Sequence, residues 1–102
     1  MRNQLLHDFF LGFINIHILH HASEKPVYGL WLIEELGKHG YKLSPGTLYP
    51  ILHTLENDEY LISQKEIVDG KIRKYYRTTE KGQNALIDAK EKIKELIEEI
   101  KI

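Results

Sequence analysis

The sequence predicts a mainly helical domain with one small β-hairpin, in which the two ends of the chain serve dimerisation. Three observations lead to this fold class. Apolar residues recur at helical spacing in four segments, and an Asp-Gly dipeptide separates two β-prone runs. The first and last helical segments also carry more apolar surface than a single domain of 102 residues can bury.

Composition narrows the class of protein. With 42% hydrophobic and 28% charged residues, the chain resembles globular rather than disordered proteins. It has no cysteine, which excludes disulfides and thiolate metal sites. The longest unbroken apolar run, Phe9–Ile14, is too short to span a membrane, and no signal-peptide cleavage pattern follows it. We therefore expect a cytoplasmic protein without a membrane partner.

The first predicted helix covers about residues 4–21 and is apolar around most of its circumference. Ten of the fifteen residues from Leu5 to Leu19 are apolar. A surface helix of a monomer has an apolar stripe on one side only, so burial against a second subunit is the simplest explanation. The residues of this helix that we assign to a homodimer interface are Leu6, Phe9, Phe10 and Phe13.

A second helix is predicted from Pro26, which suits a first helical turn, to about His39, with Gly40 as its stop. Its expected buried residues are Leu30, Ile33 and Leu36.

A third helix follows after three residues. Ser44 suits the N-cap and Pro45 the first helical position. Because Pro50 removes a backbone hydrogen bond, we expect an irregular or 3₁₀-like first turn. The buried stripe of this helix is expected to be Leu48, Ile51, Leu52 and Leu55.

Two strands, Leu61–Val68 and Lys71–Thr78, are predicted on either side of Asp69-Gly70. Asp-Gly is a strong signal for a two-residue hairpin turn, in which both residues need positive φ. Such a turn pairs the residues of the two strands as follows: Ile67 with Ile72, Glu66 with Arg73, Lys65 with Lys74, and Ser63 with Tyr76. The two opposed lysines would repel by up to about 1 kcal/mol, and a nearby phosphate would reverse that effect.

The last predicted helix is capped by Thr79 and runs to the C-terminus. Its apolar residues alternate in steps of three and four, as in a coiled-coil seam. We assign this seam to the dimer interface: Leu86, Ala89, Ile93, Leu96 and Ile100. Residues 1–102 are thus expected to form one domain, with the helices and hairpin over about 4–78 and a dimerisation helix over about 79–102.

Two helices joined by a tight turn and followed by a hairpin indicate a winged helix-turn-helix, whose third helix enters the DNA major groove. The net charge of −1 does not favour nucleic acid, but from Lys38 to Arg77 there are seven basic against five acidic residues. This local excess allows a DNA-binding patch. The residues predicted to contact double-stranded DNA are Lys42, Ser44, Gly46, Thr47, Tyr49, Pro50, His53, Lys71, Arg73 and Lys74.

The segment Ser44–Glu56, SPGTLYPILHTLE, resembles the recognition helix of the PadR family of transcriptional regulators. The likeness continues through Arg73-Lys74 and Tyr76 to Thr79 and Gly82. It implies a dimeric winged-helix repressor whose N- and C-terminal helices build the dimer. Because a dimer places two recognition helices about one DNA turn apart, we expect an inverted-repeat operator.

The chain departs from the family pattern at three positions. Leu30 follows Gly29 where the family often has tyrosine, and Thr78 replaces an aliphatic residue. Glu59 stands where a glycine commonly ends the recognition segment, so we expect Asn57 or Asp58 to provide the left-handed stop.

Other functions have weaker signals. His17, His20 and His21 share a helical spacing compatible with a metal site, but Glu24 is the only acidic neighbour, so we expect interface or surface histidines and no metal. Trp31 is expected to anchor the core or an interface. Some PadR relatives bind aromatic effectors, so binding of a small-molecule effector is left as an open question.

No catalytic constellation is evident, so we expect neither an enzyme nor a cofactor. The alternatives are a winged helix that binds a protein, and a MarR-like regulator.

Overall fold

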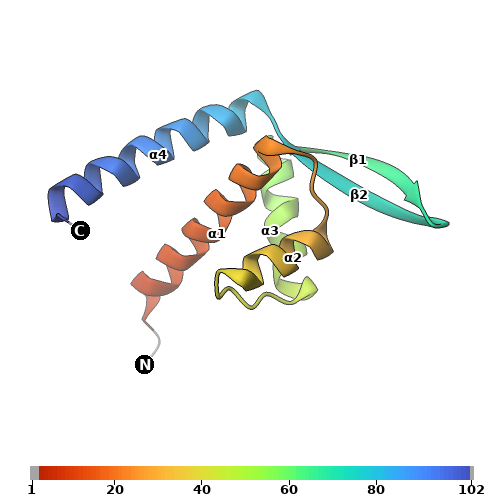
Figure 1. The fold of residues 1–102 in the computed structure, drawn as a ribbon, viewed down its shortest axis with the longest axis horizontal. Helices are drawn as coiled ribbons and strands as arrows, with labels where there is room; N and C mark the ends of the chain where they lie inside the picture. Colours follow the sequence, from red (N-terminus) through yellow and green to blue (C-terminus); the bar gives the residue numbers. More distant parts are fainter. Residues whose placement is uncertain (1–2, 102) are drawn as a thin grey trace.

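The computed structural model describes residues 3–101, and its element order is the predicted one (Figure 1). The elements are α1 (Gln4–Glu24), α2 (Gly29–Lys38), α3 (Pro45–Asn57), β1 (Leu61–Val68), β2 (Lys71–Thr78) and α4 (Glu80–Ile100). The helices α1, α2 and α3 pack together, and the hairpin projects from them as a wing (Figure 1). The predicted fold class, a mainly helical winged helix-turn-helix, is confirmed.

The hydrophobic core lies where α1, α2 and α3 meet the base of the hairpin and the first turns of α4. Its buried members are Ile14, Ile18, Leu19, Ala22, Val27, Leu32, Leu36, Leu48, Leu52, Leu55, Leu61, Tyr76 and Leu86. Trp31, expected as a core or interface anchor, is half-buried and packs against this core. None of the helices formed by residues 4–100 is long and apolar enough to cross a membrane.

The hairpin has the predicted strands and the predicted register, including Ile67 opposite Ile72 and Lys65 opposite Lys74. Asp69 and Gly70 have φ values of 51° and 76°, the positive values that a two-residue turn of this kind needs. At its base, the hairpin gains a short third partner. The amide of Val27 donates to the Tyr76 carbonyl at 3.0 Å, and the amide of Tyr76 donates back to the Val27 carbonyl at 2.7 Å.

This bridge explains two errors at the start of α2. The helix was expected to begin at Pro26, but it begins at Gly29, because Val27 is held in extended conformation against Tyr76. Leu30 was expected in the core and is 62% exposed, since the shifted helix buries Leu32 instead. The first helix also continues to Glu24, beyond its predicted end.

The helix α3 begins as predicted, with Ser44 at the N-cap and Pro45 in the first turn, although the Ser44 side chain makes no capping bond. The irregular first turn expected from Pro50 was wrong. The α-helix is continuous, although the Thr47 amide bonds to the Ser44 carbonyl at 3.1 Å with 3₁₀ spacing. Gly46, whose carbonyl Pro50 would crowd, carries no side chain and can adjust to the ring.

The left-handed stop after α3 is Glu59, with φ of 65°, rather than the expected Asn57 or Asp58. The amide of Glu59 bonds to the Glu56 carbonyl at 3.0 Å, and the amide of Tyr60 bonds to the Leu55 carbonyl at 2.9 Å. These two bonds are those of a Schellman motif. The chain therefore places a glutamate in the position that glycine would occupy with less strain.

The helix α4 begins as predicted, because the Thr79 hydroxyl accepts a hydrogen bond from the Gly82 amide at 3.0 Å. A Cβ at Gly82 would overlap the Tyr60 carbonyl, so this contact with the α3–β1 turn requires glycine. Leu86, which we had assigned to a dimer interface, instead packs in the core of its own chain and has no surface left for a partner. Beyond it, α4 extends away from the other helices (Figure 1).

Candidate nucleic-acid interface

A groove of about 680 Å³ lies between the helix-turn-helix and the wing. Its lining comes from the start of α2, from α3 and from the outer half of the hairpin: Tyr28, Gly29, Leu30, Tyr49, Val68, Asp69, Lys71, Ile72, Arg73 and Lys74. Four of the ten residues predicted to contact DNA therefore come together in one concavity, and three of these four are basic. Such a groove attracts an anionic ligand.

Arg73 is positioned by aromatic side chains. Its guanidinium lies 4.0 Å from the centre of the Tyr28 ring and donates to the Tyr75 hydroxyl at 3.4 Å. The hydrogen bond to Tyr75 raises the pKa of Arg73 above its ordinary value. Glu66 lies opposite Arg73 in the hairpin, but the two form no ion pair among residues 3–101. Arg73 thus keeps its charge free of a carboxylate while its orientation is restricted.

Lys74 is tied to the third helix. Its ammonium lies 3.1 Å from a carboxylate oxygen of Glu56, and the Ser63 hydroxyl donates to the other oxygen of that carboxylate. The Ser63 hydrogen bond is the main reason that the pKa of Glu56 is lowered, and Glu56 in turn raises the pKa of Lys74. The repulsion between Lys65 and Lys74 that we expected is therefore relieved within the protein, without a phosphate.

The remaining predicted DNA contacts lie outside the groove. Lys42, Gly46 and His53 are exposed on or just before α3, as are Ser44 and Thr47, whose hydroxyls lie 3.2 Å apart. Pro50 is different, because it lines a hollow shared with α1. It faces away from the wing, among Leu11, Asn15, Ile51 and Thr54.

Six of the ten lining residues were not predicted as DNA contacts, and two of them, Tyr28 and Leu30, come from the start of α2. Their neighbour Gly29 also lines the groove and lies directly under the Tyr49 ring. A Cβ at Gly29 would overlap the Tyr49 hydroxyl. Glycine therefore lets the recognition helix approach α2 and sets the position of Tyr49. The unusual Gly29-Leu30 pair was the signal, but the sequence alone did not show what it faced.

The model of the PadR-like family of transcriptional regulators matches residues 18–88, well over half of the chain. The chain belongs to the PadR family. It is a PadR-like transcriptional regulator, so the MarR-like alternative is set aside. The matched region runs from the second half of α1 to the first turns of α4 and includes the whole groove.

Known relatives agree with this membership. The chain is 45% identical over 95 residues to the transcriptional regulator Rv3488 of Mycobacterium tuberculosis, covering 93% of this chain and 89% of that protein. Among solved structures, a PadR-like transcription factor from Bacteroides fragilis superposes with a TM-score of 0.84 at 30% identity, covering 97% of each chain. A PadR family regulator from Eggerthella lenta gives 0.81 at 29% identity, covering 94% of this chain and 85% of that one.

Within this PadR chain, the departure at Thr78 has a structural role. Its hydroxyl donates to the Leu19 carbonyl of α1 at 2.7 Å. A polar residue there adds a hydrogen bond between the last residue of the wing and the first helix, which an aliphatic residue cannot make.

The Glu56–Lys74 pair predicts a specific pH dependence of stability. Because the pKa of Glu56 is lower in the folded protein than its ordinary 4.5, the stabilisation is present above pH 4.5 and is lost as the pH falls through the lowered value. We expect Glu56→Gln to reduce the free energy of unfolding by roughly 1 kcal/mol at pH 7, and by progressively less as the pH falls below 4.5.

Urea denaturation at several pH values measures this difference. Glu66→Gln removes the same charge from an exposed position on β1 that forms no ion pair within residues 3–101, and should change stability little at any pH. Equal losses for the two variants, or a Glu56→Gln loss that is independent of pH, would contradict the assignment.

Proposed function

We propose that this PadR regulator binds duplex DNA as a homodimer and represses transcription at an inverted-repeat operator. The observation that carries the proposal is the groove between α3 and the wing, which brings Lys71, Arg73 and Lys74 to one side of the recognition helix. In a winged helix-turn-helix, this arrangement puts the third helix in the major groove while the wing follows the adjacent backbone.

The recognition helix offers different chemistry along its length. Its N-terminus presents backbone amides and the hydroxyl pair of Ser44 and Thr47, which suit a phosphate, with Lys42 just before them. Thr47 and His53 are exposed and suit contacts with base edges. Tyr49, held over Gly29 inside the groove, is suited to a phosphate through its hydroxyl.

The wing contributes charge rather than sequence selectivity. Neutralising Lys71 or Arg73, as Lys71→Gln or Arg73→Gln, should weaken binding to all duplexes to a similar degree. It should also lower the slope of log affinity against log salt by about 0.9 for each phosphate that the variant no longer neutralises. Lys74→Gln should lower the slope less, because Glu56 already balances that charge.

Fluorescence anisotropy of a labelled duplex at several salt concentrations measures these slopes. Lys90→Gln, an equal change of charge on the exposed side of α4, is the control and should have a smaller effect. If Arg73→Gln and Lys90→Gln shift the slope equally, the wing is not part of the interface. Failure of the wild-type chain to bind any duplex would instead favour a winged helix that binds a protein.

The second half of the proposal concerns the dimer. The outer halves of α1 and α4 carry large apolar side chains that their own chain leaves uncovered. On α1, Leu6, Phe9 and Phe10 are each between 47% and 49% exposed, and on α4, Leu96 and Ile100 are more than half exposed. These two ends lie on the side opposite the wing (Figure 1). Exposed large apolar side chains at the ends of two helices, as here, are typical of a protein interface.

A second copy of the chain is the partner that would cover the apolar side chains of both α1 and α4. Phe13, Ala89 and Ile93 are half-buried where the two helices approach the core, so they continue the same surface inward. Two-fold pairing would place the recognition helices of the two subunits on the same face of DNA. The operator would then be an inverted repeat with half-sites about one turn, or 34–36 Å, apart.

The double change Phe9→Glu with Leu96→Glu should convert the dimer into a monomer, because it buries two unpaired carboxylates at the interface. Sedimentation velocity measures the change. Binding to a two-half-site duplex should fall much more than binding to one half-site. Ile62→Glu, at an apolar position on the hairpin that is even more exposed, should leave the dimer intact. A wild-type chain that sediments as a monomer would contradict this part of the proposal.

A further inference from the structure

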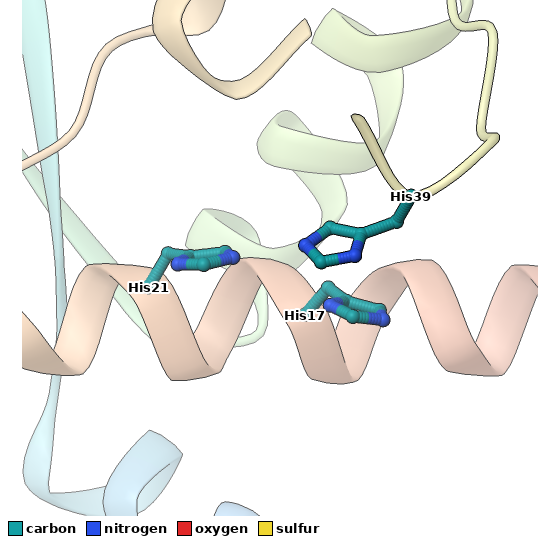
Figure 2. A group of neighbouring side chains, drawn as sticks. All are labelled: His17, His21 and His39. Atoms are coloured by element: carbon teal, nitrogen blue, oxygen red, sulfur yellow. The ribbon is translucent and has the colours of Figure 1, made fainter. Parts of the chain in front are cut away.

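Three histidines from two helices meet at the side of the helix-turn-helix. His17 and His21 lie one turn apart on α1, and Figure 2 shows His39, at the C-cap of α2, reaching toward them. One potential ligand nitrogen from each side chain lies within 4.8 Å of the other two. From the sequence we considered His17, His20 and His21 and expected no metal there. The structure adds His39, a residue distant in sequence, to His17 and His21.

The side chains around the cluster leave these nitrogens available. The Nε2 of His21 is buried, and within residues 3–101 it has no hydrogen-bond partner. Burial is the main cause that lowers the pKa of both His17 and His21, with neighbouring histidines adding to the effect. An imidazole nitrogen that has no hydrogen-bond partner, such as the Nε2 of His21, is open to a metal ion.

An acidic group also lies beside the cluster. A carboxylate oxygen of Glu35 on α2 is 3.7 Å from the Nε2 of His39. A carboxylate next to a ligand histidine orients the imidazole and increases its basicity, and such a partner commonly accompanies bound zinc. The Glu35 side chain is only 20% exposed, so its charge acts in a partly desolvated setting.

We propose that His17, His21 and His39 form a binding site for a divalent transition-metal ion of the zinc type, with three imidazole ligands and a fourth position open to water. Three histidines with one open position are a common coordination for zinc. Tetrahedral bonds of 2.0–2.1 Å put ligand atoms about 3.3 Å apart, so atoms that now lie within 4.8 Å of one another need to approach by at most about 1.5 Å.

The site would connect α1 to the segment that leads into the recognition helix. His39 is followed by Gly40, with φ of 88°, and by Tyr41, whose ring contacts both His17 and Phe10 of α1. A metal ion held by both elements fixes the helix-turn-helix against the helix that we assign to the dimer. The metal site thus lies between the element proposed to bind DNA and the helix proposed to form the dimer. The metal site itself does not depend on DNA binding.

The test is calorimetric titration of Zn²⁺ into the untagged, chelator-treated full chain. We expect one ion per chain, and visible absorption of the four-coordinate type when Co²⁺ replaces Zn²⁺. His39→Gln changes an exposed residue and should weaken binding at least a hundredfold, as should His17→Gln. Glu35→Gln should weaken it about tenfold, as expected for a residue that orients a ligand.

The adjacent group of His20, His21 and Glu24 provides the control, because its ligand atoms also lie within 4.8 Å of one another. His20→Gln should leave the affinity within about twofold of wild type. Loss of binding in His20→Gln with retention in His39→Gln would move the metal to that group and overturn the proposal. Absence of stoichiometric Zn²⁺ binding by the wild-type chain would overturn it as well, whatever the DNA affinity.

Discussion

The pairing of Val27 with Tyr76 holds the two parts of the molecule together. A two-stranded hairpin is at best marginally stable in water, so the wing needs support from elsewhere. Two backbone hydrogen bonds to Val27 add a one-residue β-bridge to it, and the Tyr76 side chain, only 1% exposed, anchors β2 in the helical core. Burial of that ring raises the pKa of the Tyr76 hydroxyl. The direction in which the wing points follows from this junction.

The groove is a consequence of that fixed direction. With β2 anchored at its base, Lys74 meets Glu56 of α3, and Arg73 comes to lie over Tyr28 at the start of α2. The wing is therefore connected to both helices of the helix-turn-helix by charged and aromatic contacts. Because the contacts order the basic side chains before any ligand arrives, less conformational entropy is lost when DNA binds.

The sequence predicted what depends on local rules and missed what depends on contacts between distant residues. The register of the hairpin followed from Asp69-Gly70, because that turn type determines the pairing of both strands. The start of α2 was misplaced because the Val27 bridge overrides the preference of Pro26 for a helix. His39 could not be joined to the α1 histidines, since only the packing of α2 on α1 brings them together.

The central claim is that α3 and the wing form one surface for duplex DNA. Amide chemical-shift mapping of the labelled protein during titration with a short duplex tests it most directly. The account predicts that the largest shifts fall together on the start of α3, around Gly46 and Thr47, and on the wing around Lys71 and Arg73. Shifts confined to the outer ends of α1 and α4, or to the wing with α3 unaffected, would contradict it.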